Sequence, residues 1–318
     1  MPRVAITFIS ILFLSITGLA RAQMTGKVGD PNRYENPQLL ITAEELHARL
    51  EEPRLRIIDV RSQDAYAQGH IPGAVNLPIG QITVTRNGIP GMLAPQEVVE
   101  ESLGAVGVTP ESRVVIYDEA GGDRATRLFW VLDYYGHPHM AVLDGGFAAW
   151  QAAAFPITTA VPAVPKTTYR GTPDPAKLAT GEWIRDHLTD PAVVLVDARS
   201  RAEFRGKVAG RGVKIAGHIP GAVNIDWVRN LTETAPRKIL PPTTLRRLYA
   251  EVGISQDKTV VVYCRSGMRA SHTYFVLRLL GYPRVRLYDG SWLEWANSGK
   301  FPLQHQCRLD NTLRTRQG

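Results

Sequence analysis

A cysteine and two arginines share one short loop of this chain, at a place where an anion would be stabilised. Cys264 follows the apolar residues 259–263, which predict a buried strand, and residues 270–280 predict a helix. The loop between them also carries Arg265 and Arg269. Unpaired N–H groups at a helix N-terminus favour anions, and so do nearby arginines. We expect Cys264 to act as a thiolate nucleophile rather than as an inert core cysteine.

The elements that position this loop occur twice along the chain. The sequence Gly-His-Ile-Pro-Gly-Ala-Val-Asn at 69–76 recurs identically at 217–224, and an Asp-x-Arg motif precedes each copy. An Asp-Gly-x-x-x-x-Trp motif follows in each half, at 144–150 and 289–295. Self-similarity on this scale indicates that one structural unit is repeated.

Each copy alternates short apolar strands with helical patterns, which predicts an α/β fold with a parallel sheet flanked by helices. We expect domains at 38–155 and 178–303, joined by a proline-rich, extended linker at 156–177. Cys264 then falls at the carboxyl end of a strand, where open α/β sheets bind their ligands. The expected strands are 55–59, 74–76, 113–117 and 140–143 in the first copy, and 193–197, 222–224, 259–263 and 285–288 in the second.

The first copy lacks the chemistry of the second. Asp118 occupies the position that matches Cys264, in a loop that is one residue longer and contains three acidic residues. Such a loop has no thiol and would repel an anion. We therefore expect the N-terminal domain to be non-catalytic and to form one wall of a cleft.

Taken together, the repeated motifs and the cysteine loop resemble the rhodanese family of sulfurtransferases in its tandem two-domain form. All the motifs except the cysteine loop occur in both copies, so the resemblance covers nearly the whole chain after its N-terminal segment. It implies that Cys264 takes a sulfane sulfur from a donor such as thiosulfate and holds it as a persulfide. The sulfur then passes to a thiophilic acceptor, cyanide or a thiol. No cofactor and no metal is implied.

The resemblance also implies roles for the residues around Cys264. Relatives that prefer 3-mercaptopyruvate usually have Cys-Gly-Ser-Gly in this loop, so Arg265 favours thiosulfate, with 3-mercaptopyruvate as the alternative donor. Glu203 stands where some thiosulfate enzymes have a substrate arginine, and Arg269 is expected to bind the sulfonate instead. The residues expected to bind the anionic donor are Arg265, Ser266, Gly267, Met268 and Arg269.

Three further residues are candidates for supporting roles. Asp197 and Arg199 recur in the copy that lacks the cysteine, so a structural ion pair or turn is the simpler interpretation. The same reasoning makes His70 a residue that organises its own loop. A histidine is nevertheless a plausible proton carrier, so His70 could instead face the cleft.

Two other functions are compatible with a reactive cysteine. Phosphate ester cleavage by a cysteine loop uses Cys-x5-Arg, whereas Cys264 to Arg269 is Cys-x4-Arg, one residue too short to enclose a phosphoryl group. The spacing therefore disfavours a phosphatase. A persulfide carrier or a binding module without turnover would need the same thiol, and this alternative stays open.

The N-terminus and the composition bear on location and partners. Arg3, an apolar stretch over 4–19 and Ala20-Arg21-Ala22 predict a signal peptide at 1–22, cleaved after Ala22, and hence a periplasmic or secreted protein. Cleavage lowers the net charge from +7 to +5, because it removes two arginines and no acid. We find no nucleic-acid motif, no metal-ligand spacing and no further membrane segment, and we expect a monomer. Cys307 is expected to be a surface thiol, although a disulfide with Cys264 is possible.

Overall fold

Two parallel sheets form the framework of the protein, one in each copy of the repeat. This computed structural model describes Met1 and residues 30–303, so the rest of the predicted signal peptide, and Cys307, lie outside the described residues. The first sheet has the order β1-β7-β6-β2-β3, and the second has the order β10-β9-β11-β12-β8. All the pairings within these two sheets are parallel. The fold is therefore α/β with two similar halves, as the alternating pattern and the sequence repeat predicted.

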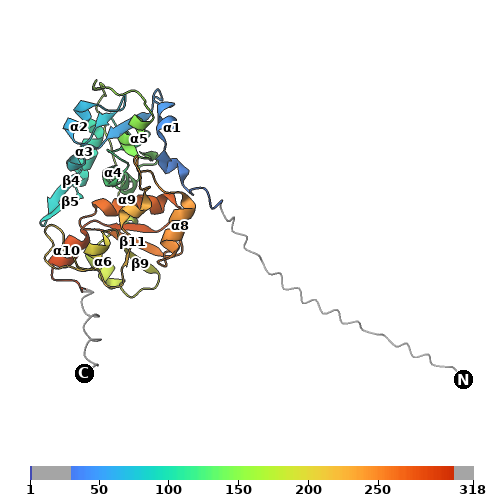
Figure 1. The fold of residues 1–318 in the computed structure, drawn as a ribbon, viewed down its shortest axis with the longest axis vertical. Helices are drawn as coiled ribbons and strands as arrows, with labels where there is room; N and C mark the ends of the chain where they lie inside the picture. The colour runs from blue at the N-terminus through green and yellow to red at the C-terminus, as the bar shows by residue number, and fades with distance from the viewer. Residues whose placement is uncertain (2–29, 304–318) are drawn as a thin grey trace, which may run out of the picture.

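The helices flank these sheets in both halves (Figure 1). The first half contains β1 (Leu40–Ile41), α1 (Ala43–His47), β2 (Leu55–Asp59), α2 (Gln63–Gln68), β3 (Val75–Asn76), β4 (Thr83–Arg86), β5 (Ile89–Leu93), α3 (Gln96–Ala105), β6 (Arg113–Tyr117), α4 (Asp123–Tyr134), β7 (Met140–Leu143) and α5 (Gly146–Ala152). The second half contains β8 (Leu178–Ala179), α6 (Gly181–Asp186), β9 (Val193–Asp197), α7 (Arg201–Phe204), β10 (Val223–Asn224), α8 (Pro242–Ala250), β11 (Thr259–Tyr263), α9 (Met268–Leu279), β12 (Val285–Tyr288) and α10 (Ser291–Asn297). Short 3-10 helices are η1 (Pro37–Leu39), η2 (Ile79–Gln81), η3 (Pro175–Lys177) and η4 (Trp227–Asn230).

The predicted strands are present, each within one residue of its expected bounds. The edge strands β1 and β8 were not predicted, because two residues carry no measurable periodicity. The helix after the active loop begins at Met268, two residues before the predicted start. Met268 and Arg269 therefore belong to the first turn of α9 rather than to the loop, which places their N–H groups at a helix terminus.

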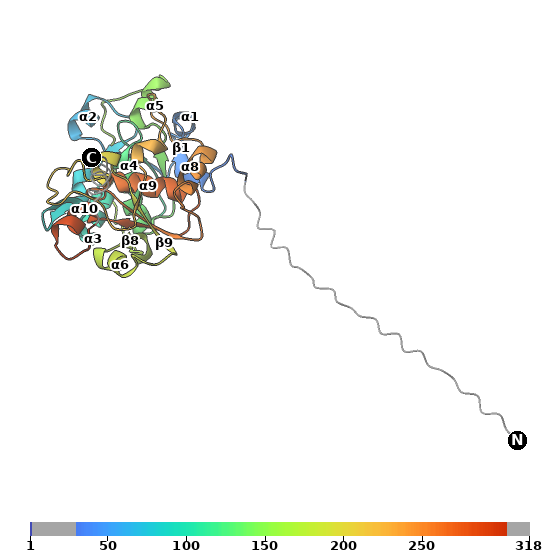
Figure 2. The same ribbon diagram turned by 60° about the horizontal axis from the view of Figure 1, so that its bottom comes forward.

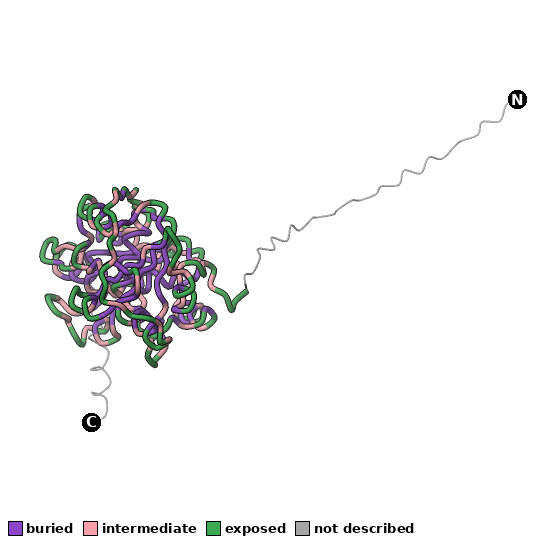
Figure 3. Tube along the Cα trace, turned by 90° about the horizontal axis from the view of Figure 1, so that it is seen from above, coloured by how far each residue is buried: buried purple, intermediate pink, exposed green. Residues whose placement is uncertain are grey.

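Helices α4 and α9 pack side by side at the centre of the molecule (Figures 1 and 2). Both helices are buried around much of their circumference, and Phe129 meets Phe275 edge to face with ring centroids 4.9 Å apart. One continuous cluster of buried apolar side chains includes residues of both halves. Figure 3 shows this buried zone running through the middle of the molecule. The two halves therefore share a core, and the cleft expected between them is closed over most of its depth.

Each half covers the strand ends of the other. The main-chain N–H of Leu93, at the end of the β4–β5 hairpin, donates to Asp289 Oδ2 at 2.8 Å. In the reverse direction, the N–H of Ile239 donates to Asp144 Oδ1 at 2.9 Å. Asp144 and Asp289 are the matching aspartates of the repeated Asp-Gly-x-x-x-x-Trp motif. This motif thus fastens the opposite half of the molecule, a role that the sequence repeat alone did not reveal.

The linker between the halves does not span open solvent. It lacks regular structure until η3, but it is tied to the first half along its length. Thr158 pairs with His70, Thr167 N–H donates to Gly104 O at 2.9 Å, and Tyr169 is buried. The segment has no helix before η3. Its contacts attach it to the first half rather than leaving it as a free linker.

Candidate active site

Residues at the start of α10 hold the loop that carries Cys264 in place. The N–H groups of Cys264 and Gly267 both donate to Ser291 Oγ, at 3.1 and 3.0 Å. The Ser291 hydroxyl in turn donates to Tyr288 O at 2.7 Å, and Trp292 N–H donates to Cys264 O at 3.0 Å. Ser291 has a φ of 51°, a conformation that a non-glycine residue rarely adopts. Strain of this kind is common where surrounding contacts hold a functional loop.

Gly267 is required where the loop turns into α9. Its φ is 81°, and a Cβ at this position would lie 2.9 Å from Asp289 Oδ1 and 3.1 Å from Arg127 Nη1. Asp289 and Arg127 also pair with each other, at 2.6 Å, and Arg127 belongs to the first half. The N-terminal domain therefore packs directly against the loop with a fully buried arginine. Sequence reasoning missed Arg127, Asp289 and Ser291, although the last two lie in the repeated motif.

The matching loop of the first half shows what this backbone geometry binds. The carboxylate of Asp118 turns inward and accepts hydrogen bonds from three loop N–H groups. Those of Ala120 and Gly122 lie 3.1 and 2.8 Å from Oδ1, and that of Ala125 lies 3.0 Å from Oδ2. Successive inward N–H groups of this kind form a nest for an anion. In the first half the Asp118 carboxylate is itself the anion in the nest, so this loop has no room for a bound anion.

The nest of the second half contains no carboxylate. Cys264 replaces Asp118, is only 1% exposed and is a free thiol. Ala270 matches Ala125, whose N–H binds the Asp118 carboxylate. Within the described residues, several main-chain N–H groups around Cys264 have no acceptor, namely those of Arg265, Ser266, Met268, Arg269 and Ala270. The geometry can therefore accommodate an anion centred on the sulfur atom.

Arg269 is not a free cation, which corrects the expectation that it binds the donor's sulfonate. Its Nη1 and Nη2 donate to Glu203 Oε2 and Oε1 at 2.8 and 2.9 Å, a bidentate ion pair. Burial raises the pKa of Glu203, but hydrogen bonds and charge from Arg269, with help from Ser200, lower it to about 2. Burial lowers the pKa of Arg269, but Glu203 and the nearby Cys264 outweigh this effect. The pKa of Arg269 is therefore raised above its usual value. Glu203 thus neutralises an arginine that lies close enough to Cys264 for their charges to interact.

Arg265 has a different environment. Its side chain is half-buried and Nη1 donates to the carbonyl oxygen of Arg211 at 3.0 Å. No carboxylate pairs with Arg265 among the residues that the structure describes. Of the two loop arginines, Arg265 is therefore the one whose charge is not neutralised by an ion pair.

Asp197 and Arg199 form the ion pair that the repeat predicted, and it lies behind the loop. Arg199 Nη2 lies 2.6 Å from Asp197 Oδ2, and both side chains are buried. Arg199 also donates to the carbonyl oxygen of Gly217 at 2.7 Å, which joins the end of β9 to the Gly-His-Ile-Pro segment. Asp59 and Arg61 repeat this arrangement in the first half. Their role is to hold strand ends in place.

His70 does not face the cleft, and this corrects the second possibility raised for it. It is fully buried and stacks on Tyr66 with ring centroids 3.7 Å apart. Its Nδ1 lies 2.9 Å from Tyr66 O, and its Nε2 lies 3.2 Å from Ala160 O. Both ring nitrogens are therefore engaged by the main chain, and His70 organises its own loop and the start of the linker.

Comparison with known proteins agrees with this geometry. The rhodanese-like domain family matches the chain twice, over residues 42–153 and 180–298. The chain belongs to the rhodanese-like family. Thiosulfate sulfurtransferase from Azotobacter vinelandii is 35% identical over 84% of this chain and 97% of its own length. A probable 3-mercaptopyruvate sulfurtransferase from Pseudomonas aeruginosa is also 35% identical, over 83% of this chain and 97% of its own length.

A solved structure is also similar in shape. The anaerobic ergothioneine biosynthesis enzyme from Chlorobium limicola, in complex with trimethyl histidine, is 26% identical, with a TM-score of 0.76. The match covers 87% of this rhodanese-like chain and 72% of the other. The curated relatives place this protein among the sulfurtransferases. In the part of the chain that is described, no cluster of His, Cys, Asp and Glu could hold a metal, and no helix could cross a membrane.

Proposed function

We propose that this rhodanese-like protein is a thiosulfate sulfurtransferase that works through a persulfide on Cys264. The observation that carries the proposal is the pair of matching nests. Asp118 fills the first nest with a carboxylate. Cys264 begins the second, where the N–H groups of the loop and first helical turn other than those bound to Ser291 have no protein acceptor among the described residues. A nest that binds a carboxylate in one half suits a thiolate or a persulfide anion in the other.

The proposed reaction has two displacement steps. The Cys264 thiolate attacks the outer sulfur of thiosulfate, the sulfur–sulfur bond breaks, and sulfite leaves with the bonding electrons. Cyanide or a thiolate then attacks the terminal sulfur of the persulfide, and Cys264 leaves as a thiolate. The negative charge lies on the Cys264 sulfur in the thiolate, moves to the outer sulfur of the persulfide in the first step and returns to Cys264 in the second. The loop N–H groups that have no acceptor among the described residues, on a backbone that Ser291 holds in place, can stabilise both forms without rearranging.

The donor assignment depends on Arg265. Because Glu203 occupies Arg269, the side chain that remains for the sulfonate of thiosulfate is that of Arg265, with the loop N–H groups beside it. The similarity to the Azotobacter vinelandii enzyme supports thiosulfate, whereas the similarity to the Pseudomonas aeruginosa protein keeps 3-mercaptopyruvate as the alternative donor. We further propose that residues 1–22 direct export, and that the exported protein acts as a monomer.

The proposal is tested by following the sulfur. Incubation with thiosulfate should add about 32 Da, one sulfur atom, to a peptide that contains Cys264. Cys264→Ser should abolish the adduct and turnover, while Cys307→Ser should preserve both. Arg265→Ala should lower kcat/KM for thiosulfate by about tenfold and leave alkylation by neutral iodoacetamide nearly unchanged. An adduct on Cys307, or a much better kcat/KM with 3-mercaptopyruvate than with thiosulfate, would contradict the assignment.

A further inference from the structure

The second half carries a strongly basic segment beside the active loop, and the first half has no counterpart to it. The segment lies between Ser200 and Gly217, where the first half has only the short helix α2 between Ser62 and Gly69. Its only acid, Glu203, is already paired with Arg269. We call its five cations the basic rim: Arg201, Arg205, Lys207, Arg211 and Lys214. All five are exposed, and none is paired with a carboxylate among the described residues.

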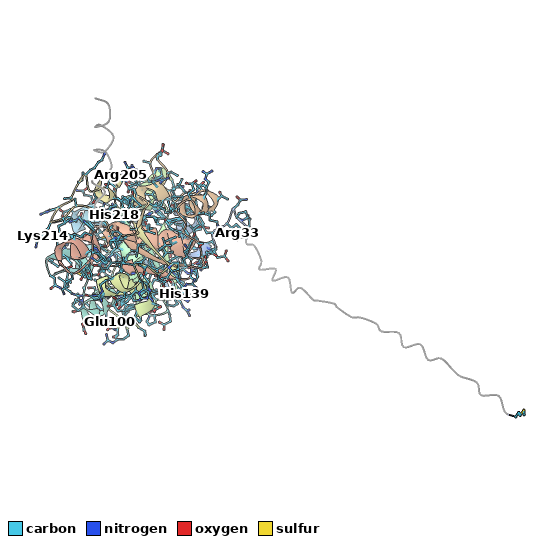
Figure 4. The ribbon with its side chains drawn as sticks, turned by 90° about the horizontal axis from the view of Figure 1, so that it is seen from below. Arg33, Glu100, His139, Arg205, Lys214 and His218 are labelled. Atoms are coloured by element: carbon cyan, nitrogen blue, oxygen red, sulfur yellow. The ribbon has the colours of Figure 1, made fainter. Side chains whose placement is uncertain are left out.

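The basic rim is held in place against α10 and the active loop. Trp292 Nε1 donates to Ile215 O at 3.1 Å, and Asn297 bonds the main chain of Gly212 and Lys214, at 2.9 Å each. These bonds use the backbone of the segment, so its cationic side chains stay available to solvent. Figure 4 labels two residues of the rim, Arg205 and Lys214.

The rim is also connected to Cys264 through contacts of the neighbouring Arg265. Arg265, the neighbour of Cys264, donates to Arg211 O at 3.0 Å. A Cβ on Gly210 would lie 3.5 Å from Arg265 Cδ and 3.6 Å from Glu203 Oε1. Because Cys264 is only 1% exposed, an acceptor thiol must be carried by a narrow side chain to reach its sulfur. Charges that hold the acceptor must therefore lie outside the loop, where the rim is.

Two features of the rim suit a protein surface better than a small inorganic anion. Val208 lies among the cations and is 51% exposed, one of the few large apolar side chains that the described residues leave in solvent. Two residues of the rim also line a cavity of about 270 Å³, whose lining is Arg201, Phe204, Arg205, Val223 and Asn224. An exposed apolar side chain among cations, together with a pocket that contains two arginines in the same segment, is typical of a polar protein interface that receives an acidic side chain.

We propose that the basic rim docks an acidic protein whose thiol takes the sulfur from Cys264. This inference rests on the proposed persulfide function. The acceptor thiolate would attack the terminal sulfur of the Cys264 persulfide, the bond to Cys264 would break, and the acceptor would leave as a persulfide with Cys264 restored as a thiolate. The rim raises the encounter rate with acidic partners and orients them toward the loop.

The test isolates the second half of the reaction. The full protein is loaded with sulfur from thiosulfate, freed of donor, and mixed with one of two synthetic cysteine peptides, one rich in Asp and Glu and one neutral. Loss of the 32 Da adduct is followed by mass spectrometry. The wild-type protein should transfer to the acidic peptide about tenfold faster than to the neutral one, and this preference should fade at high salt.

Charge reversal on the rim supplies the decisive comparison. Lys207→Glu/Lys214→Glu should abolish the preference for the acidic peptide and leave transfer to the neutral peptide within about twofold. The control Arg247→Glu/Lys258→Glu makes the same change in net charge, with Lys258 at the opposite end of β11 from Cys264, and should keep the preference. The inference is overturned if the wild-type protein shows no preference, or if both double variants lose it equally. Failure to load Cys264 at all would instead contradict the proposed function.

Discussion

Glu203 accepts two hydrogen bonds from Arg269, a residue 66 positions later in the chain, and so neutralises one of the two arginines that follow Cys264. The pair is nearly buried, with 12% of the Glu203 side chain and 24% of the Arg269 side chain exposed. It fixes the first turn of α9 against α7 and compensates one positive charge beside the cysteine loop. If thiosulfate binds at this loop as proposed, the pair makes the loop more rigid and lowers its affinity for the dianion.

Removing the charge of Glu203 should strengthen thiosulfate binding. Glu203→Gln keeps the shape of the side chain and one acceptor, and it leaves Arg269 uncompensated beside the loop. We expect KM for thiosulfate to fall about three- to tenfold, as steady-state kinetics will measure. Glu251→Gln, which removes an exposed carboxylate from a surface pair, serves as the control. An unchanged or higher KM would show that Arg269 does not reach the donor even when free.

The same pair should make stability depend on acid. The pKa of Glu203 is lowered from 4.5 to about 2, so the folded state favours its ionised form. The resulting stabilisation, about 3 kcal/mol at most, is complete above about pH 5 and is lost as the pH falls toward 2. In urea unfolding, the difference between the wild-type protein and Glu203→Gln should therefore be constant from pH 7 to 5 and shrink below pH 4. A difference that grows on acidification would be inconsistent with this sign.

Ser291 should matter to both stability and catalysis. Ser291→Ala leaves the buried N–H groups of Cys264 and Gly267 without their acceptor, which should cost about 1–3 kcal/mol of unfolding free energy. Because the loop loses its anchor, kcat should fall about tenfold at unchanged thiosulfate KM. Ser298→Ala, at the other end of α10, removes two longer hydrogen bonds, to Trp295 O and from the exposed Lys300 N–H, and is the matched control. Equal effects of the two substitutions would argue against a specific role for Ser291.

Asp118 should stabilise the protein without taking part in the reaction. Asp118→Ala empties the first nest and strands the N–H groups of Ala120, Gly122 and Ala125, at a cost of about 3 kcal/mol in unfolding free energy. The adduct on Cys264 should still form, and kcat per folded molecule should stay within about twofold of the wild type. Thermal unfolding and the loading assay together check both halves of this prediction. Loss of loading in a folded Asp118→Ala protein would mean that the first nest takes part in catalysis.

Local patterns in the sequence determined the fold class, the repeated architecture and the position of the nucleophile. Apolar runs such as 259–263 predict their strands because a buried parallel strand needs apolar side chains on both faces. The pair of Asp197 and Arg199 was predictable because its members stand two residues apart and recur in both copies. The β4–β5 hairpin was missed, since its partly exposed residues carry little hydrophobic alternation.

Only the tertiary structure decided which charged side chains form ion pairs and which residues of one half bind residues of the other. Glu203 meets Arg269 because the sheet order sets β9 beside β11, and no spacing in the sequence encodes that neighbourhood. Arg127 reaches Asp289 across 162 residues because α4 and α9 pack together. Residue types and short spacings record local chemistry, whereas the pairing of distant charges depends on how the chain closes on itself. The sequence therefore located Cys264, and the fold determined that Arg269 is neutralised by a carboxylate whereas Arg265 is not.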